Sequence, residues 1–236
     1  MYAHGILLAL GTVVSSVTFV NRAQTLSLNK RTALVMILIL IPVGLLASHL
    51  TYAISEDPSS FLELQGISSL GGLLACLLGL VLFTFRDRES RWRWFDAAAY
   101  AGVGGALIAR LGCFLAHDRI GSPTSFLLSV KCFEGSFYDL ALLEMIFLAV
   151  CLGLIVWLTR QGSSPLEGMI FSMVAVSYGA LRVALGQLSE GTERYVGLLP
   201  EQFCAVILVA AGACCWLLAR HHARHASAPL FTKHRS

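Results

Sequence analysis

Two arginines lie inside long apolar stretches of the chain, where a charged side chain needs a specific reason to be. Arg110 stands in ALIARLGCFLAHDRIGSPT and Arg182 stands in VSYGALRVALGQ. A charge at the centre of a membrane costs at least about 2.5–3.5 kcal/mol on insertion scales, so it normally has a partner or lines a wet cavity. Arginine stays charged and offers a planar fork of donors that suits phosphate or carboxylate. The two arginines could therefore hold the phosphate of a lipid.

The alternative is that each arginine joins neighbouring helices by pairing with a carboxylate. The segment FYDLALLE supplies two candidates, Asp139 and Glu144. Asp139 lies near the outer end of its apolar stretch, where we expect a water-exposed carboxylate. Glu144 lies about one and a half turns deeper, so the two side chains point to different faces of a helix. Either could neutralise an arginine or act as a base, and Glu144 is favoured as the structural partner.

The composition predicts that these residues are positioned by membrane helices. Of the 236 residues, 56% are hydrophobic and only 13% are charged, against a charged share of about 25% in soluble domains. So few charges could not cover a soluble globule, and they exclude disorder and coiled coil as well. The net charge of +3 is too small to indicate a nucleic-acid partner. Seven stretches approach the roughly 20 residues that a bilayer requires: 1–20, 33–54, 67–85, 96–116, 138–158, 168–187 and 202–219.

The loops between these stretches predict an orientation. Twelve of the seventeen Lys and Arg residues fall in one set of loops and in the C-terminal tail, and three fall in the opposite set. Because positive loops stay in the cytoplasm, we expect the N-terminus outside and the C-terminus inside. The sequence thus predicts an all-α polytopic protein, with a seven-helix membrane domain over 1–220 and a basic cytoplasmic tail over 221–236.

Glycine and cysteine usage adds two further expectations. Gly102, Gly104, Gly105 and Gly112 leave one side of the 96–116 stretch nearly bare, which permits close approach of another helix or could admit a lipid chain. The seven cysteines lack paired C-x-x-C spacing, so no metal site is predicted from them. The tail sequence HHARH at 221–225 is interpreted as a solvated basic tail rather than a metal site.

Several motifs together resemble those of one family. Arg110-Leu-Gly-Cys-Phe, followed by Gly121 and Thr124, resembles the signature G-R-x-G-N-F, then Gly and Thr, of the prolipoprotein diacylglyceryl transferases. Further similar segments follow the family's order along nearly the whole chain: His4-Gly5, Ser69-Leu-Gly71-Gly72-Leu73, Phe137-Tyr138-Asp139, Tyr178-Gly179-A-L-Arg182, and Gly197-Leu198 with Gln202.

The resemblance implies a reaction and its partners. It implies transfer of diacylglyceryl from phosphatidylglycerol to the lipobox cysteine thiol of a prolipoprotein, with release of glycerol phosphate, in the bacterial cytoplasmic membrane. By the same resemblance Arg110 would hold the head group, Arg182 would stabilise charge at the entrance, and Asp139 would replace a family glutamate. The positions carried over as substrate-binding are Arg110, Tyr138, Gly71, Gly72, Cys113 and Gly121. The partners are phosphatidylglycerol and the prolipoprotein signal peptide, and no cofactor or metal is required because the substrate carries the nucleophile.

Four positions depart from the family pattern: Leu70 replaces a histidine, Cys113 an asparagine, His4 a tyrosine and Gly186 a glutamate. The loss of that histidine removes a candidate base. His117 and Asp118 could substitute as catalytic residues, since imidazole can accept a proton near neutral pH. The alternative function is a non-catalytic lipid-binding membrane protein that keeps the arginines without the full chemistry. A solute transporter is disfavoured because the chain shows no internal repeat.

Overall fold

The computed structural model describes residues 2–55, 68–87, 90–132, 135–161, 166–189 and 199–226. Within these ranges the chain forms a polytopic helical bundle with one small sheet. The elements in chain order are α1 (Tyr2–Thr25), α2 (Lys30–Ser55), α3 (Ser69–Phe83), α4 (Arg91–Ala116), β1 (Ile120–Pro123), β2 (Ser129–Cys132), β3 (Gly135–Asp139), α5 (Leu140–Arg160), α6 (Met169–Gln187) and α7 (Pro200–Ala226).

Six of the helices are long and apolar enough to cross a membrane, and α3 is a shorter apolar helix. The 15 residues of α3 rise about 22 Å, compared with about 30 Å for a hydrocarbon core. Each helix coincides with one of the stretches expected from the sequence, although α1 and α7 continue beyond them to Thr25 and Ala226. The chain is therefore a multi-pass membrane protein.

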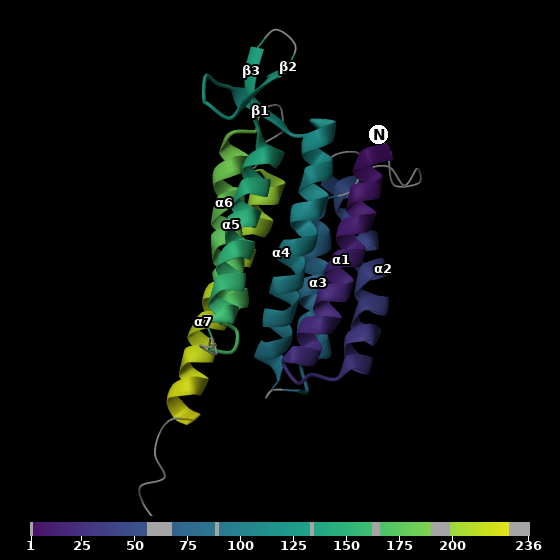
Figure 1. The fold of residues 1–236 in the computed structure, drawn as a ribbon, viewed down its shortest axis with the longest axis vertical. Coiled ribbons are helices and arrows are strands. Elements are labelled where there is room, and N and C mark those ends of the chain that lie inside the picture. The colour runs from purple at the N-terminus through teal and green to yellow at the C-terminus, as the bar shows by residue number, and fades with distance from the viewer. Residues whose placement is uncertain are drawn as a thin grey trace, which may run out of the picture.

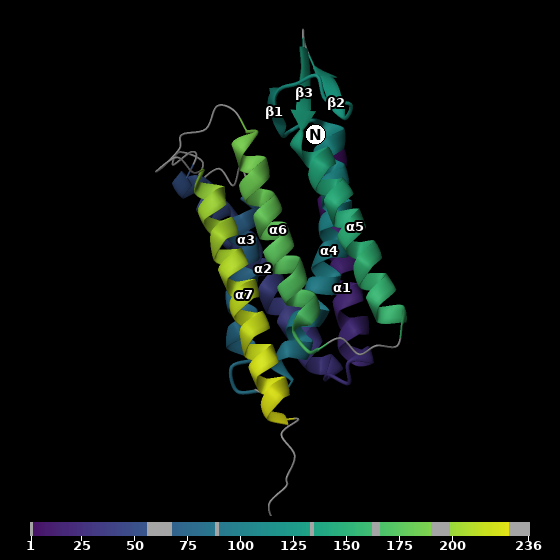
Figure 2. The ribbon, with the colours of Figure 1, turned by 90° about the vertical axis from the view of Figure 1, so that its left-hand side faces the viewer.

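Helix α4 lies in the middle of the bundle, where it contacts α1, α5 and α6. Further large contacts join α6 with α7 and α2 with α3, and smaller ones join α1 with α2, α3 with α7 and α5 with α6. The beginning of α1, the end of α4 and the small sheet gather at one end of the bundle, and α7 ends at the opposite end (Figures 1 and 2). The topology therefore places the first residues of α1 close to the residues that follow α4.

Glycine permits the close contact between α1 and α4. A Cβ atom on Gly105 would lie 2.7 Å from the carbonyl oxygen of Gly11, and one on Gly112 would lie 3.1 Å from a side chain of α1. By contrast, a Cβ on Gly102 or Gly104 would meet nothing within 4 Å. The predicted close helix approach is confirmed for Gly105 and Gly112, while the other two glycines do not contribute to it.

The sheet departs from the all-α prediction, and it lies almost entirely between the expected membrane stretches 96–116 and 138–158. Its strands are antiparallel in the order β1-β3-β2, with Val130 opposite Phe137. Strands of four or five residues that contain Gly and Pro give almost no alternating pattern, which explains why the sequence did not indicate them. The last residue of β3, Asp139, leads directly into α5.

Candidate active site

A buried carboxylate joins three helices near the centre of the candidate site. Glu144 of α5 is fully buried. Its Oε1 atom is 3.0 Å from Nε of Arg110 on α4, and its Oε2 atom is 3.2 Å from Nη1 of Arg182 on α6. The hydroxyl group of Tyr178, also on α6, donates to the same carboxylate. Because buried charges need partners, this cluster explains how two arginines are accommodated between the helices.

A second carboxylate extends the cluster to α7. Glu201 accepts hydrogen bonds from Nη2 of Arg182 and, at 2.6 Å, from Nη2 of Arg119. The three arginines and two glutamates leave a formal excess of one positive charge. An excess of positive charge held in place by surrounding side chains is suited to an anion or to developing negative charge.

Arg110 also contacts two residues outside the carboxylates. Its Nη2 donates to the hydroxyl of Ser69 on α3 at 3.3 Å, and its Nη1 donates to Sγ of Cys113 at 3.6 Å. The side chain is therefore held from three helices, with 8% of its surface exposed. The interhelical pairing expected as an alternative is confirmed with Glu144, and Asp139 is not the partner of either arginine.

Asp139 instead forms a pair with His117. One carboxylate oxygen of Asp139 accepts from the backbone N–H of Leu142 at 3.0 Å and so caps α5. The other oxygen is 3.0 Å from Nδ1 of His117. The expectation of a water-exposed carboxylate was wrong, because as the capping residue Asp139 turns over the start of α5 and is 2% exposed. The His117 side chain remains 42% exposed. The pair therefore consists of an exposed imidazole ring and the buried carboxylate that holds it in place.

His117 also directs the chain at the end of α4. It adopts a left-handed backbone conformation with φ of 48° and ends the helix. The backbone N–H of Asp118 then bonds back to the carbonyl of Cys113 at 3.4 Å. This turn brings the Asp118 side chain beside the last turn of α4, where its Oδ2 atom is 3.6 Å from Nδ1 of His4 on α1. Of the two substitute bases expected from the sequence, His117 pairs with Asp139 and Asp118 pairs with His4.

The remaining predicted substrate-binding residues occupy packed positions. A Cβ on Gly71 or Gly72 would lie 2.2 Å from a hydroxyl oxygen of α2, so both glycines serve the α2–α3 contact. Gly121 is buried in β1, where a Cβ would lie 2.7 Å from a backbone carbonyl. Tyr138 lies on β3, with its ring centroid 6.0 Å from that of Phe126. Packing accounts for these positions, and their role in substrate binding stays a prediction.

The structure adds three residues that the sequence reasoning did not select. Tyr178 lies one helical turn before Arg182, a spacing that places both on one face, and this signal was present in the motif. Glu201 follows a proline at the start of an apolar stretch, and Arg119 is one of the three basic residues in the less basic set of loops. The side chain of Leu70, the Gly197-Leu198 motif and residues 227–236 lie outside the described residues.

Comparison with known proteins shows which proteins this chain is similar to. The family model "Prolipoprotein diacylglyceryl transferase" matches residues 1–218. A phosphatidylglycerol–prolipoprotein diacylglyceryl transferase of Bacillus mycoides (strain KBAB4) is 26% identical over 133 residues, covering 53% of this chain and 49% of the relative. The protein of the same name from Bacillus cereus (strain B4264) is 25% identical over 157 residues, covering 58% of each. The chain thus matches about half the length of these curated relatives.

Proposed function

The chain belongs to the prolipoprotein diacylglyceryl transferase family, and on that premise we propose that it transfers diacylglyceryl from phosphatidylglycerol to a prolipoprotein cysteine. The proposal rests mainly on the sequence context and the contacts of Arg110. This arginine stands in the segment that resembles the family signature, and it belongs to a cluster with one excess positive charge. The relatives' names supply the lipid donor and the protein acceptor.

The reaction requires positive charge where the phosphate leaves. The acceptor thiol loses its proton, its sulfur forms a bond to the terminal glyceryl carbon, and the bond from that carbon to the phosphate oxygen breaks. The electron pair departs on glycerol phosphate. Arg110 would bind the phosphate, and Arg182 would add to the positive potential, because donors fixed in advance at a developing charge lower the barrier most. Glu144 would hold both guanidinium groups in place.

The proton acceptor must differ from that of the family pattern, because Leu70 replaces the histidine that is the candidate base there. His117 is proposed as the base, since its exposed imidazole is held by the buried carboxylate of Asp139 at 3.0 Å. A carboxylate on one ring nitrogen fixes the tautomer and orientation of a histidine. This arrangement would supply the function that the histidine replaced by Leu70 has in the family.

The site is proposed to open to the outer face of the membrane. In this orientation the chain crosses the bilayer seven times, with its N-terminus outside and residues 221–236 in the cytoplasm. The bias of Lys and Arg supports it, as do the opposite positions of the beginning of α1 and the end of α7 (Figure 1). A prolipoprotein exported through the membrane would present its lipobox cysteine on that side.

The experiment that tests the function uses the full chain in phosphatidylglycerol vesicles with a lipobox peptide. Mass spectrometry should show that the peptide cysteine gains one diacylglyceryl group. Arg110→Ala should abolish this product while the protein still inserts into vesicles. Arg93→Ala is the matched control, because Arg93 lies on the same helix but pairs with the exposed Glu167 at 3.5 Å. Normal transfer by Arg110→Ala would contradict the site, and lipid binding without transfer by the unaltered protein would indicate a lipid-binding protein instead.

A further inference from the structure

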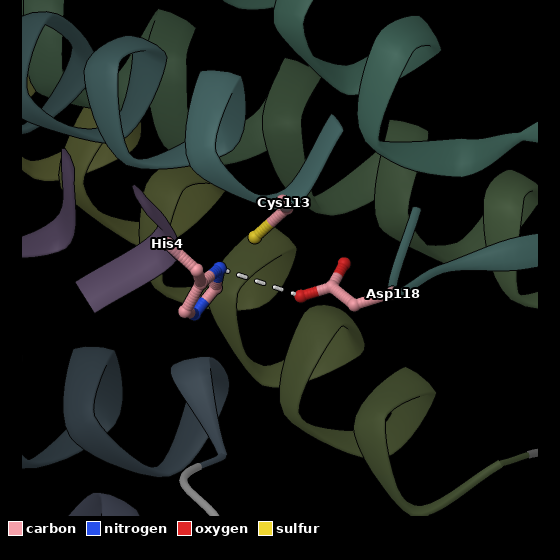
Figure 3. Close-up of side chains that lie close together, drawn as sticks. All are labelled: His4, Cys113 and Asp118. Carbon is pink, nitrogen blue, oxygen red and sulfur yellow. Dashed lines mark ion pairs between the residues drawn. The ribbon is translucent and has the colours of Figure 1, made fainter. Parts of the chain in front are cut away.

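Three potential metal ligands meet between α1 and the end of α4. Nδ1 of His4, Sγ of Cys113 and a carboxylate oxygen of Asp118 all lie within 4.8 Å of one another. Figure 3 shows the three side chains pointing into the same space from different segments. Nδ1 of His4 is buried, and within the described residues it has no hydrogen-bond partner. This buried ring nitrogen faces a thiol and a carboxylate, and a metal ion bound among them would compensate for its burial.

The separations fit a tetrahedral zinc site. With bonds of about 2.0–2.3 Å to nitrogen, oxygen and sulfur, two ligands at a tetrahedral angle are about 3.3–3.7 Å apart. The His4 nitrogen and the Asp118 oxygen are 3.6 Å apart. Their side chains are 30% and 38% exposed, so small rotations of these two side chains can bring the ligands onto one ion. The buried Cys113 supplies the fixed corner of the site.

The fold builds this cluster through specific local features. Gly112 lets α1 approach α4, because a Cβ there would lie 3.3 Å from the carbonyl oxygen of His4. The left-handed turn at His117 brings Asp118 back beside Cys113. Zn²⁺ with one thiolate, one carboxylate and a neutral imidazole is a neutral complex, which suits the edge of a membrane.

A covalent role for Cys113 does not fit the proposed reaction. Transfer of diacylglyceryl to its sulfur would form a thioether, and this product has no leaving group that would allow a second transfer to the acceptor. Covalent catalysis requires an intermediate that breaks down more readily than the substrate. The thiol is therefore better explained as a ligand than as a nucleophile.

We propose that His4, Cys113 and Asp118 form a Zn²⁺ site with one open position, and that the acceptor thiol binds there as the fourth ligand. Three protein ligands and an open position are typical of zinc that acts on a substrate. The assignment of the fourth ligand rests on the proposed function, and the three-ligand site does not. On binding, the acceptor thiol gives up its proton to the base named in the proposed function. The zinc-bound thiolate then attacks the glyceryl carbon, and glycerol phosphate leaves with the electron pair of the broken carbon–oxygen bond.

The metal site is tested on the full chain, purified in detergent through a tag without histidine and stripped with a chelator. Titration with Co²⁺ should give one equivalent with a sulfur-to-cobalt charge-transfer absorption, and Zn²⁺ should displace it. The tail over 221–236 contains histidines but no cysteine, so Co²⁺ bound there would lack this absorption. An absence of the absorption in the unaltered protein would overturn the proposal.

Variants identify the ligands. Cys113→Ser should lose the charge-transfer absorption, and Cys214→Ser is the matched control because Cys214 is an exposed cysteine of α7. His4→Gln and Asp118→Asn should keep the absorption with affinity weakened at least about tenfold, since the loss even of an outer-shell group costs 10–100-fold. If Cys113→Ser retains the absorption, or if His4→Gln binds as tightly as the unaltered protein, the site is wrong.

The fourth ligand is tested with the lipobox peptide. Its addition to the Co²⁺-loaded protein should increase the charge-transfer absorption, because a second thiolate joins the metal, and a peptide with serine in place of its cysteine should not. An unchanged spectrum with the cysteine peptide would overturn the role of the metal in acceptor binding. Diacylglyceryl transfer that persists after chelation would overturn that role while leaving the proposed function intact. Conversely, Co²⁺ binding without any transfer would contradict only the proposed function.

Discussion

Glu144 offers the sharpest test of how the buried arginines are held. Glu144→Gln keeps the size of the side chain and a hydrogen-bond acceptor, but it removes the negative charge that faces Arg110 and Arg182 at 3.0 and 3.2 Å. Arg182 still has Glu201, whereas Glu144 is the carboxylate that pairs with Arg110 among the described residues. The substitution therefore leaves Arg110 as a buried charge without its counterion.

The expected loss is large for a single isosteric change. Removing one partner of a buried ion pair costs about 3–5 kcal/mol, because the remaining charge is neither paired nor solvated. The matched control is Glu167→Gln, which makes the same chemical change in the pair with Arg93, where Glu167 is 51% exposed. Exposed pairs contribute about 0–1 kcal/mol, so the control should lose at most that amount.

The measurement is the free energy of unfolding in mixed micelles titrated with SDS. A second variant, Glu144→Gln with Arg110→Met, separates charge from packing, because replacing both partners of a buried pair by neutral groups is often close to neutral. The double variant should recover at least about 1 kcal/mol over Glu144→Gln, a coupling in the range for residues in contact. Equal losses for Glu144→Gln and Glu167→Gln, or no recovery in the double variant, would show that Arg110 does not depend on Glu144 as its counterion.

Three further changes have defined outcomes. Arg110→Lys should reduce transfer to the lipobox peptide about 100-fold, because an ammonium group cannot reproduce the guanidinium fork; near-normal rates by mass spectrometry would contradict a bidentate contact. Asp139→Asn should change the free energy of unfolding by less than about 1 kcal/mol, since Asn also caps helices, yet lower the transfer rate by removing the charge beside His117; unaltered transfer would exclude this pair as the base. Gly112→Val should cost about 1–3 kcal/mol of unfolding free energy by overpacking the α1–α4 contact, whereas Gly102→Val, which meets open space, should not, and equal losses would contradict the packing argument.

The helices could be predicted from the sequence because membrane spans depend on length and apolarity. Each apolar stretch in the sequence corresponds to one helix of the structure. The buried arginines pair with a carboxylate, because a buried charge requires a partner. The family resemblance was likewise visible in short ordered motifs, and the match over residues 1–218 confirms it. These features depend on local sequence or on simple energetic rules.

Which residues meet in space could not be predicted in the same way. Asp139 and Glu144 are both carboxylates of one segment, yet the first caps α5 and holds His117 while the second binds two arginines. That division follows from how the sheet enters α5, and the sheet itself has strands too short to give a pattern. The His4–Cys113–Asp118 cluster is hidden for a similar reason, since its members come together only through a helix contact and a left-handed turn.

We propose that this chain transfers diacylglyceryl and does not only bind lipid. The most direct measurement uses phosphatidylglycerol labelled in its glycerol head group, and it follows released glycerol phosphate together with the thioether formed on a lipobox peptide. We expect one glycerol phosphate to be released for each peptide modified, and both products to be absent for Arg110→Ala. Binding of the labelled lipid with neither release nor thioether would contradict the proposal.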